Sequence, residues 1–417
     1  MSHGKSAGFG KRRFDRAATQ APSRSVATSP IQPRRVIAAS GAAQPAKSPP
    51  LMTLTLIFAL ALIFAGQEFL ALGVGPSFAL NYRSLLAFGG ADMSLLQAGQ
   101  WWRLFTAPLL HANAAHIIGN GIVLLIVGLL LERLIGMAWF ACVFAVSGVC
   151  GSVASITVND PQIISVGASG AIMGLLATTL VCSFHPAARG RQVRMRVITL
   201  RTMIPALLPL GGDASTHALH IDYSAHMGGA LAGVVLGLLI NAVWPEGEGP
   251  PVLAPVAAGL ALLGAAAAAI SVVMIAVHYP AYQKVSASLA PDAEIPSDRS
   301  AAMLASNVLV ERYPDDPRIR VVRVFDWETA GAHGAAEADL RAALSKHDQL
   351  AEMPPQFELY LRILLADELL EQGREGEAKV AAAPVCGHSL GDPDFDRNIA
   401  RSGLCGPPPA EPLGSPD

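Results

Sequence analysis

The feature that most constrains this chain is a series of long apolar segments between Leu51 and His278. A helix needs about 17–25 apolar residues to cross the hydrocarbon core of a bilayer. Only 15% of the residues are charged and 52% are hydrophobic, whereas about a quarter of the residues in a soluble protein are charged. The sequence therefore predicts an all-α polytopic membrane bundle with soluble regions at both ends.

Seven membrane spans are predicted within this region. They cover residues 51–70, 116–134, 136–156, 168–184, 193–210, 225–244 and 252–279. The fourth is short, and the fifth is the weakest prediction because Arg201 interrupts its apolar sequence.

The distribution of positive charge predicts how the spans are oriented, because cytoplasmic segments are enriched in Lys and Arg. Residues 1–50 contain a single acid, Asp15, and form a Ser-, Ala- and Pro-rich tail that we expect to be disordered. Its basic residues are Lys5, Lys11, Arg12, Arg13, Arg16, Arg24, Arg34, Arg35 and Lys47. The loop 185–196 is also basic and falls on the same side, so we expect a cytoplasmic N-terminus and an external C-terminus. A mitochondrial presequence is an alternative interpretation of the tail, but a retained cytoplasmic tail explains it more simply.

Four polar residues open three inward-running spans at a similar depth below the external surface. His116 and Asn120 begin the second span, Ser169 begins the fourth, and His226 begins the sixth. Ser169 lies in "VGASGAIMG", whose small residues would also suit a helix–helix contact. Packing and catalysis are compatible here, because glycines spaced by four residues in both helices would let their backbones approach closely. These are Gly170 and Gly174 in the fourth span and Gly229, Gly233 and Gly237 in the sixth.

Together these residues could perform nucleophilic catalysis. A serine hydroxyl needs a neighbouring base, and imidazole has a suitable pKa, so Ser169 and His226 are the candidate pair. Asn120 and His116 share a helix face and offer donors for an oxyanion, as does the backbone N–H of Ser169. No acid is apparent that would orient His226, so we expect a dyad.

Three motifs in order carry a resemblance to the rhomboid intramembrane serine proteases. They are "HANAAHIIGN", preceded by "WWRLFTAPLL", then "GASG", and then "AHMGGALAG", within residues 51–244. The resemblance implies a six-span core with a Ser169 nucleophile and a His226 base. It also implies that Gly167, His116 and Asn120 serve the oxyanion or the substrate, while His111 has either a structural or a catalytic role. It further implies that Trp102 and Arg103 hold a loop lying partly in the membrane, and that the seventh span makes a six-plus-one arrangement common in bacteria.

The resemblance further implies the partners of the chain. The expected substrates are single-span membrane proteins whose helix in the lipid bilayer is destabilised, and they would be cut near a small residue. Water would reach Ser169 from a polar recess that the loop 211–224 caps. We expect no cofactor, no nucleic acid and a bacterial inner membrane location with a periplasmic C-terminus. We expect no metal, because HExxH is absent, although a cluster could form from His217, His220, Asp222 and His226. The alternatives are a catalytically silent rhomboid-like protein that binds membrane helices, and a channel or transporter, against which we find no inverted repeat.

The segment after the last span is polar again and shows helical periodicity. Residues 280–400 are predicted to form an external helical domain of paired helices, loosely resembling tetratricopeptide repeats. This domain would present substrates or a protein partner to the core, or would be a small cap without a ligand. Cys386 and Cys405 could form a disulfide there. The predicted organisation is a tail (1–50), a core (51–244), a seventh span (252–279), this domain and a disordered tail (401–417).

Overall fold

The structure is a computed structural model that describes residues 49–72, 80–159, 163–208, 221–246, 250–296, 298–386 and 403–405. Some of the predictions concern residues outside these ranges. These residues are nearly all of the basic tail 1–50, residues 211–220 of the loop 211–224, and most of the tail 401–417. Within them the chain is helical, and the extended pairing is a single antiparallel bridge between Ala91 and Ser165.

Five of the described helices are long and apolar enough to cross a membrane. They are α1 (Leu51–Phe69), α5 (Ala114–Ile135), α6 (Met137–Val158), α9 (Tyr223–Val243) and α10 (Ala254–Ala287). Many of their large apolar side chains are exposed on the protein surface, as lipid-facing residues would be. The prediction of an all-α polytopic membrane bundle is confirmed.

The two weaker predicted spans form shorter helices. The apolar helix α7 (Ser169–Cys182) has 14 residues, and α8 (Gln192–Leu207) has 16. Arg201 of α8 is exposed, and Pro205 lies inside the helix near its C-terminal end. Neither helix reaches the length of about 20 residues that usually spans the hydrocarbon core.

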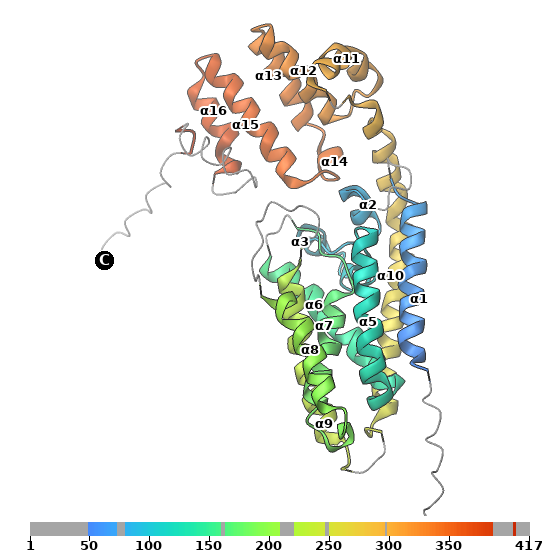
Figure 1. Cartoon of the computed structure of the whole chain (residues 1–417). Coiled ribbons are helices and arrows are strands. Elements are labelled where there is room, and N and C mark those ends of the chain that lie inside the picture. Colours follow the sequence, from blue (N-terminus) through green and yellow to red (C-terminus); the bar gives the residue numbers. More distant parts are fainter. Residues whose placement is uncertain are drawn as a thin grey trace, which may run out of the picture. The chain divides into compact units, whose positions relative to one another are not determined.

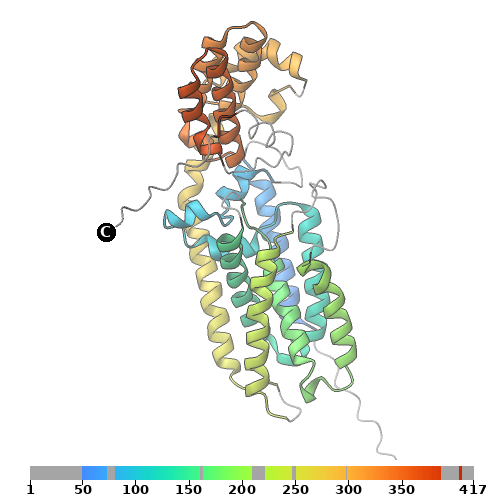
Figure 2. The ribbon, with the colours of Figure 1, turned by 90° about the vertical axis from the view of Figure 1, so that its left-hand side faces the viewer.

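The helices α6, α7 and α9 pack side by side, and α10 runs beside α6 (Figure 1 and Figure 2). The predicted glycine stripes lie in this contact. A methyl group added at Gly229 would collide with the carbonyl of Gly170, and one at Gly233 would collide with the carbonyl of Gly174. The absence of side chains at these positions therefore allows the backbones of α7 and α9 to touch.

The loop between α1 and α5 is built around a buried arginine. It contains the short helices α2 (Tyr82–Ala87), α3 (Met93–Gln97) and α4 (Arg103–Thr106). Nη1 of Arg103 donates to the carbonyls of Leu86 (2.7 Å) and Gly90 (2.9 Å), and its Nε donates to Oε1 of Gln100. Arg103 is completely buried and Trp102 nearly so. The contacts of Arg103 agree with its predicted role in holding the loop.

Among the helices after α10, α11 (Arg299–Arg312) packs against Ile319 of α12 (Pro317–Thr329) in a small cluster. A larger hydrophobic cluster is formed by α12, α13 (His333–Leu344), α14 (His347–Leu350), α15 (Pro355–Glu371) and α16 (Glu375–Ala382). One apolar face of α15 lies in this cluster, with Leu361, Leu364, Leu365 and Leu369 buried and Phe357 half-buried. Cys386 and Cys405 are joined by a disulfide.

Candidate active site

Ser169 begins α7, at the end of a short extended segment that the loop between α1 and α5 holds in place. The backbone of Ser165 exchanges two hydrogen bonds with Ala91 (2.9 and 3.0 Å), and the N–H of Gly167 donates to the carbonyl of Ala107 (2.9 Å). Ser169 itself is half-buried. The position of the serine therefore depends on the fold of that loop as well as on α7.

His226 lies one turn into α9, and a backbone carbonyl of α8 orients its ring. The Nδ1 atom lies 2.7 Å from the carbonyl oxygen of Ala206. A carbonyl oxygen only accepts, so Nδ1 carries the proton and Nε2 keeps its lone pair. Nε2 is the nitrogen that acts as the base when Nδ1 is held in this way.

No acid that would orient His226 is apparent in the sequence, and the carbonyl of Ala206 occupies that place. The last four carbonyls of a helix have no partner within the helix, and Ala206 is the second-last residue of α8. Its oxygen is therefore free to accept from another helix. No residue type encodes this contact, although the position of Ala206 near a helix end is a weak signal for it.

The residues next to Ser169 and His226 bring α7 and α9 together. A methyl group added at Gly170 would lie 3.1 Å from the carbonyl oxygen of Ala225, which is closer than most Cβ contacts, so the two backbones approach closely here. Within the described residues, the hydroxyl of Ser169 and the ring of His226 do not form a hydrogen bond with each other. In unliganded active sites such hydrogen bonds are often long and shorten only when substrate binds.

The other predicted residues gather around His116. Its ring meets that of His111 edge-on, with 5.1 Å between the ring centroids. Nδ2 of Asn120 lies 3.0 Å from Nε2 of His111. An amide nitrogen only donates, so one N–H of Asn120 is used there and the second remains for another acceptor. His111 is fully buried, which is consistent with a structural role.

Gly167 allows the ring of His116 to approach the segment before Ser169. Its φ of +125° is one that side chains rarely adopt, and an added methyl group would lie 2.6 Å from Cε1 and 2.7 Å from Nε2 of His116. A glycine is required here both for the backbone conformation and for space. The structure thus places Gly167 and His116 in direct contact.

Asp222 is engaged in hydrogen bonds at the start of α9. Its carboxylate accepts from the hydroxyls of Ser155 (2.6 Å) and Ser165 (2.8 Å), from the amide of Asn159 and from the N–H of Ala225. Burial opposes its ionisation, but these donors outweigh burial and hold the pKa of Asp222 below its usual range. Two of the other residues of the candidate metal cluster, His217 and His220, lie outside the described residues. The part of the chain that the structure describes contains no group of three or more potential metal ligands.

Comparison with known proteins places this region in one family. The Rhomboid domain profile matches residues 98–242. Rhomboid protease GluP of Bacillus subtilis is 35% identical over 153 residues, which are 37% of this chain and 29% of that protein. Putative rhomboid protease YdcA of the same organism is 32% identical over 142 residues, or 34% of this chain and 68% of that protein. Rhomboid protease AarA of Providencia stuartii is 29% identical over 178 residues, or 37% of this chain and 61% of that protein.

These matches cover different shares of the relatives' own lengths. The chain spans 29% of the length of GluP and 61% of the length of AarA, and 68% of the length of YdcA. The matched region contains α5 to α9 with Ser169, His226, His116 and Asn120. Together with its apolar helices, this makes the protein a multi-pass integral membrane protein. The chain belongs to the rhomboid family.

Proposed function

We propose that this chain is a serine endopeptidase that cleaves transmembrane segments of other membrane proteins. Ser169 would be the nucleophile and His226 the general base. The observation that carries the proposal is the hydrogen bond from Nδ1 of His226 to the carbonyl of Ala206. This bond leaves Nε2 free to accept a proton, on a helix whose backbone touches the helix that Ser169 begins.

The proposed reaction proceeds through an acyl-enzyme. The Ser169 oxygen attacks the substrate carbonyl while its proton moves to Nε2 of His226. The scissile C–N bond then breaks, and the leaving amine takes that proton. Water attacks the ester carbonyl, transfers a proton back through His226, and releases the new carboxyl end together with the Ser169 hydroxyl.

The negative charge on the carbonyl oxygen needs donors that are already in place. We assign this role to the ring of His116, to the second amide N–H of Asn120 and to the backbone N–H of Ser169. The last is a free donor at the N-terminus of α7, where the helix dipole favours negative charge. Gly167 belongs to this group because it admits the His116 ring.

The substrates would be membrane proteins whose spanning helix unwinds readily. A carbonyl within an intact helix is hydrogen-bonded and hidden from a nucleophile. We therefore expect a single-span substrate that is cut near a small, helix-destabilising position.

The proposed topology has a cytoplasmic N-terminus and a periplasmic C-terminus in a bacterial inner membrane. It is supported by the basic loop 185–196 and by the Cys386–Cys405 disulfide, which would form in an oxidising compartment. The chain would then consist of a core (51–244), a seventh span (252–279) and an external helical domain (280–400).

The test is co-expression with a tagged single-span substrate, comparing the parent with Ser169→Ala. We expect fragments from the parent and none from the variant. The matched control is Ser147→Ala on α6, because that buried hydroxyl has no hydrogen-bond partner and its loss should alter neither folding nor cleavage. Cleavage that survives Ser169→Ala would refute the nucleophile assignment. A parent that leaves a panel of such substrates intact would instead favour the catalytically silent alternative.

A further inference from the structure

The second half of α10 contacts the loop that contains Trp102 and Arg103, although α10 lies beyond the residues that the Rhomboid profile matches. The hydroxyl oxygen of Ser271 lies 3.1 Å from the carbonyl oxygen of Trp102, although its shorter hydrogen bond (2.7 Å) is to Ala267 of α10, and the ring centroids of His278 and Trp102 lie 5.7 Å apart. Farther along the helix, Nη2 of Arg103 donates to the hydroxyl oxygen of Tyr282 (3.0 Å). One face of the seventh span therefore binds this loop at several points.

Arg103 links α10 to the segment that leads to Ser169. Its guanidinium group donates to the carbonyls of Leu86 and Gly90, and the next residue, Ala91, pairs with Ser165. The N–H of Gly167, two residues before Ser169, donates to the same loop at Ala107. A continuous series of hydrogen bonds and adjacent residues thus joins the hydroxyl of Tyr282 to the start of α7.

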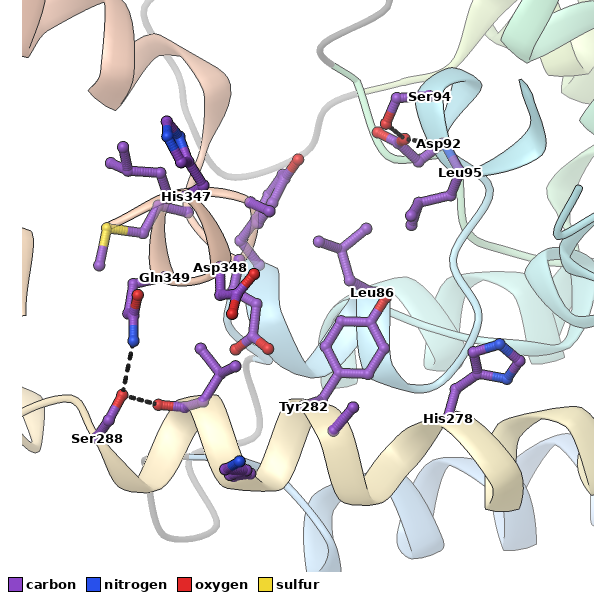
Figure 3. Close-up of a pocket in the computed structure, with 18 of the residues that line it drawn as sticks. Leu86, Asp92, Ser94, Leu95, His278, Tyr282, Ser288, His347, Asp348 and Gln349 are labelled. Carbon is purple, nitrogen blue, oxygen red and sulfur yellow. Dashed lines mark hydrogen bonds between the residues drawn. The ribbon is translucent and has the colours of Figure 1, made fainter. Parts of the chain in front are cut away.

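Tyr282 also borders a cavity, so close packing does not enclose its ring on every side. Figure 3 shows Tyr282 and His278 projecting from α10 on the same side, with Leu86 of α2 next to the Tyr282 ring. The cavity has a volume of about 1070 Å³ and is also lined by residues of α3 and of the segment 347–353. With open space beside the ring, the hydrogen bond from a charged donor is its most specific attachment to the loop.

We propose that Tyr282 is a positioning residue of the candidate active site, which acts through Arg103 to hold the segment before Ser169. The seventh span is then a support of the site and not only a membrane anchor. This inference rests on the proposed function for its effect on cleavage. Its effect on the loop itself is independent of that function.

The experiment compares Tyr282→Phe with Tyr279→Phe in the full chain. Both substitutions remove one hydroxyl from α10. The Tyr282 hydroxyl accepts from Arg103, whereas the Tyr279 hydroxyl donates to the carbonyl of Leu70, just after α1. The kcat and KM for a single-span substrate, the thermal unfolding temperature in detergent and the amide hydrogen exchange of residues 80–110 are measured for each protein.

We expect Tyr282→Phe to lower kcat about tenfold with little change in KM, the size of effect that loss of one hydrogen bond to a charged group produces. Exchange in residues 80–110 should rise in this variant. Tyr279→Phe should retain the parent kcat and the parent exchange in that loop, and both variants should unfold near the parent temperature. A merely structural role would lower the unfolding temperature and leave kcat of the folded fraction unchanged.

An unchanged kcat in Tyr282→Phe, or an equal loss in both variants, would overturn the positioning role. If the parent cleaves no substrate, the proposed function fails, and the exchange comparison then decides the structural part. Equal exchange in the parent and in Tyr282→Phe would refute the claim that Tyr282 holds the loop.

Discussion

Replacing Gly167 with alanine should impair the candidate site in a way that the structure allows to be estimated. The new methyl group would lie 2.6 Å from Cε1 of His116, whereas carbon atoms in contact are about 3.5–4.0 Å apart. The His116 ring or the segment before Ser169 must therefore move by roughly 1 Å, and misplacement on that scale costs about 10²-fold in rate. The φ of +125° adds backbone strain of about 1–3 kcal/mol.

A second glycine separates the two effects. Gly190 has a φ of +82°, and no atom lies within 4 Å of a methyl group added there. Gly190→Ala should therefore show the backbone strain without displacing any side chain of the site. It should lower the unfolding temperature modestly and leave cleavage near the parent rate.

The assay is initial-rate cleavage of a tagged single-span substrate in proteoliposomes, with thermal unfolding in detergent measured in parallel. We expect Gly167→Ala to lose about 100-fold in rate while remaining folded enough to purify. If Gly167→Ala cleaves at the parent rate, the contact between Gly167 and His116 has no bearing on catalysis. An equal loss in Gly190→Ala would show that backbone strain alone accounts for the effect.

Two further predictions concern stability. Gly229→Ala should lower the unfolding temperature strongly, because its methyl group would meet the backbone of α7. In the control, Gly259→Ala in α10, the added methyl group meets no atom within 4 Å, so this variant should be neutral or stabilising. Equal effects of the two substitutions would contradict the close packing of α7 and α9. Burial raises the pKa of Glu352 to about 8 from 4.5, with attraction to Arg83 opposing the shift and repulsion from Asp348 adding to it. The folded chain therefore binds more protons than the unfolded chain between these values, and stability should fall as the pH rises from about 4.5 to 8, by an amount on the order of a few kcal/mol. Thermal unfolding of Glu352→Gln across this range should show a flatter pH dependence than the parent, and an unchanged slope would exclude Glu352 as its source.

The positions of the apolar helices could be predicted from the sequence with small errors. Predicted spans such as 51–70 and 136–156 correspond to α1 (Leu51–Phe69) and α6 (Met137–Val158). The largest differences are at α10, which continues past residue 279 to Ala287, and at the fifth span, where α8 ends at Leu207. Hydropathy does not mark the end of α10, because a helix that leaves the lipid can continue with polar residues.

The candidate site was partly predictable. Ser169, His226, His116 and Asn120 could be selected because each is a polar residue in an apolar span, where such residues are rare. The hydrogen bond between Asn120 and His111 could not be predicted, because the choice of the Asn120 amide among several acceptors depends on side-chain orientation.

The sequence by itself determined that the chain forms membrane helices, since lipid offers no hydrogen bonds to the backbone and apolar length is read directly along the chain. It also determined which polar side chains enter those helices. Only the tertiary structure decided which group orients His226 and which residue of α10 accepts a hydrogen bond from Arg103. The first is a backbone carbonyl, which every residue carries, and the second is a tyrosine 179 residues away. Contacts of these kinds follow from how the helices pack, and no local pattern of residues encodes them.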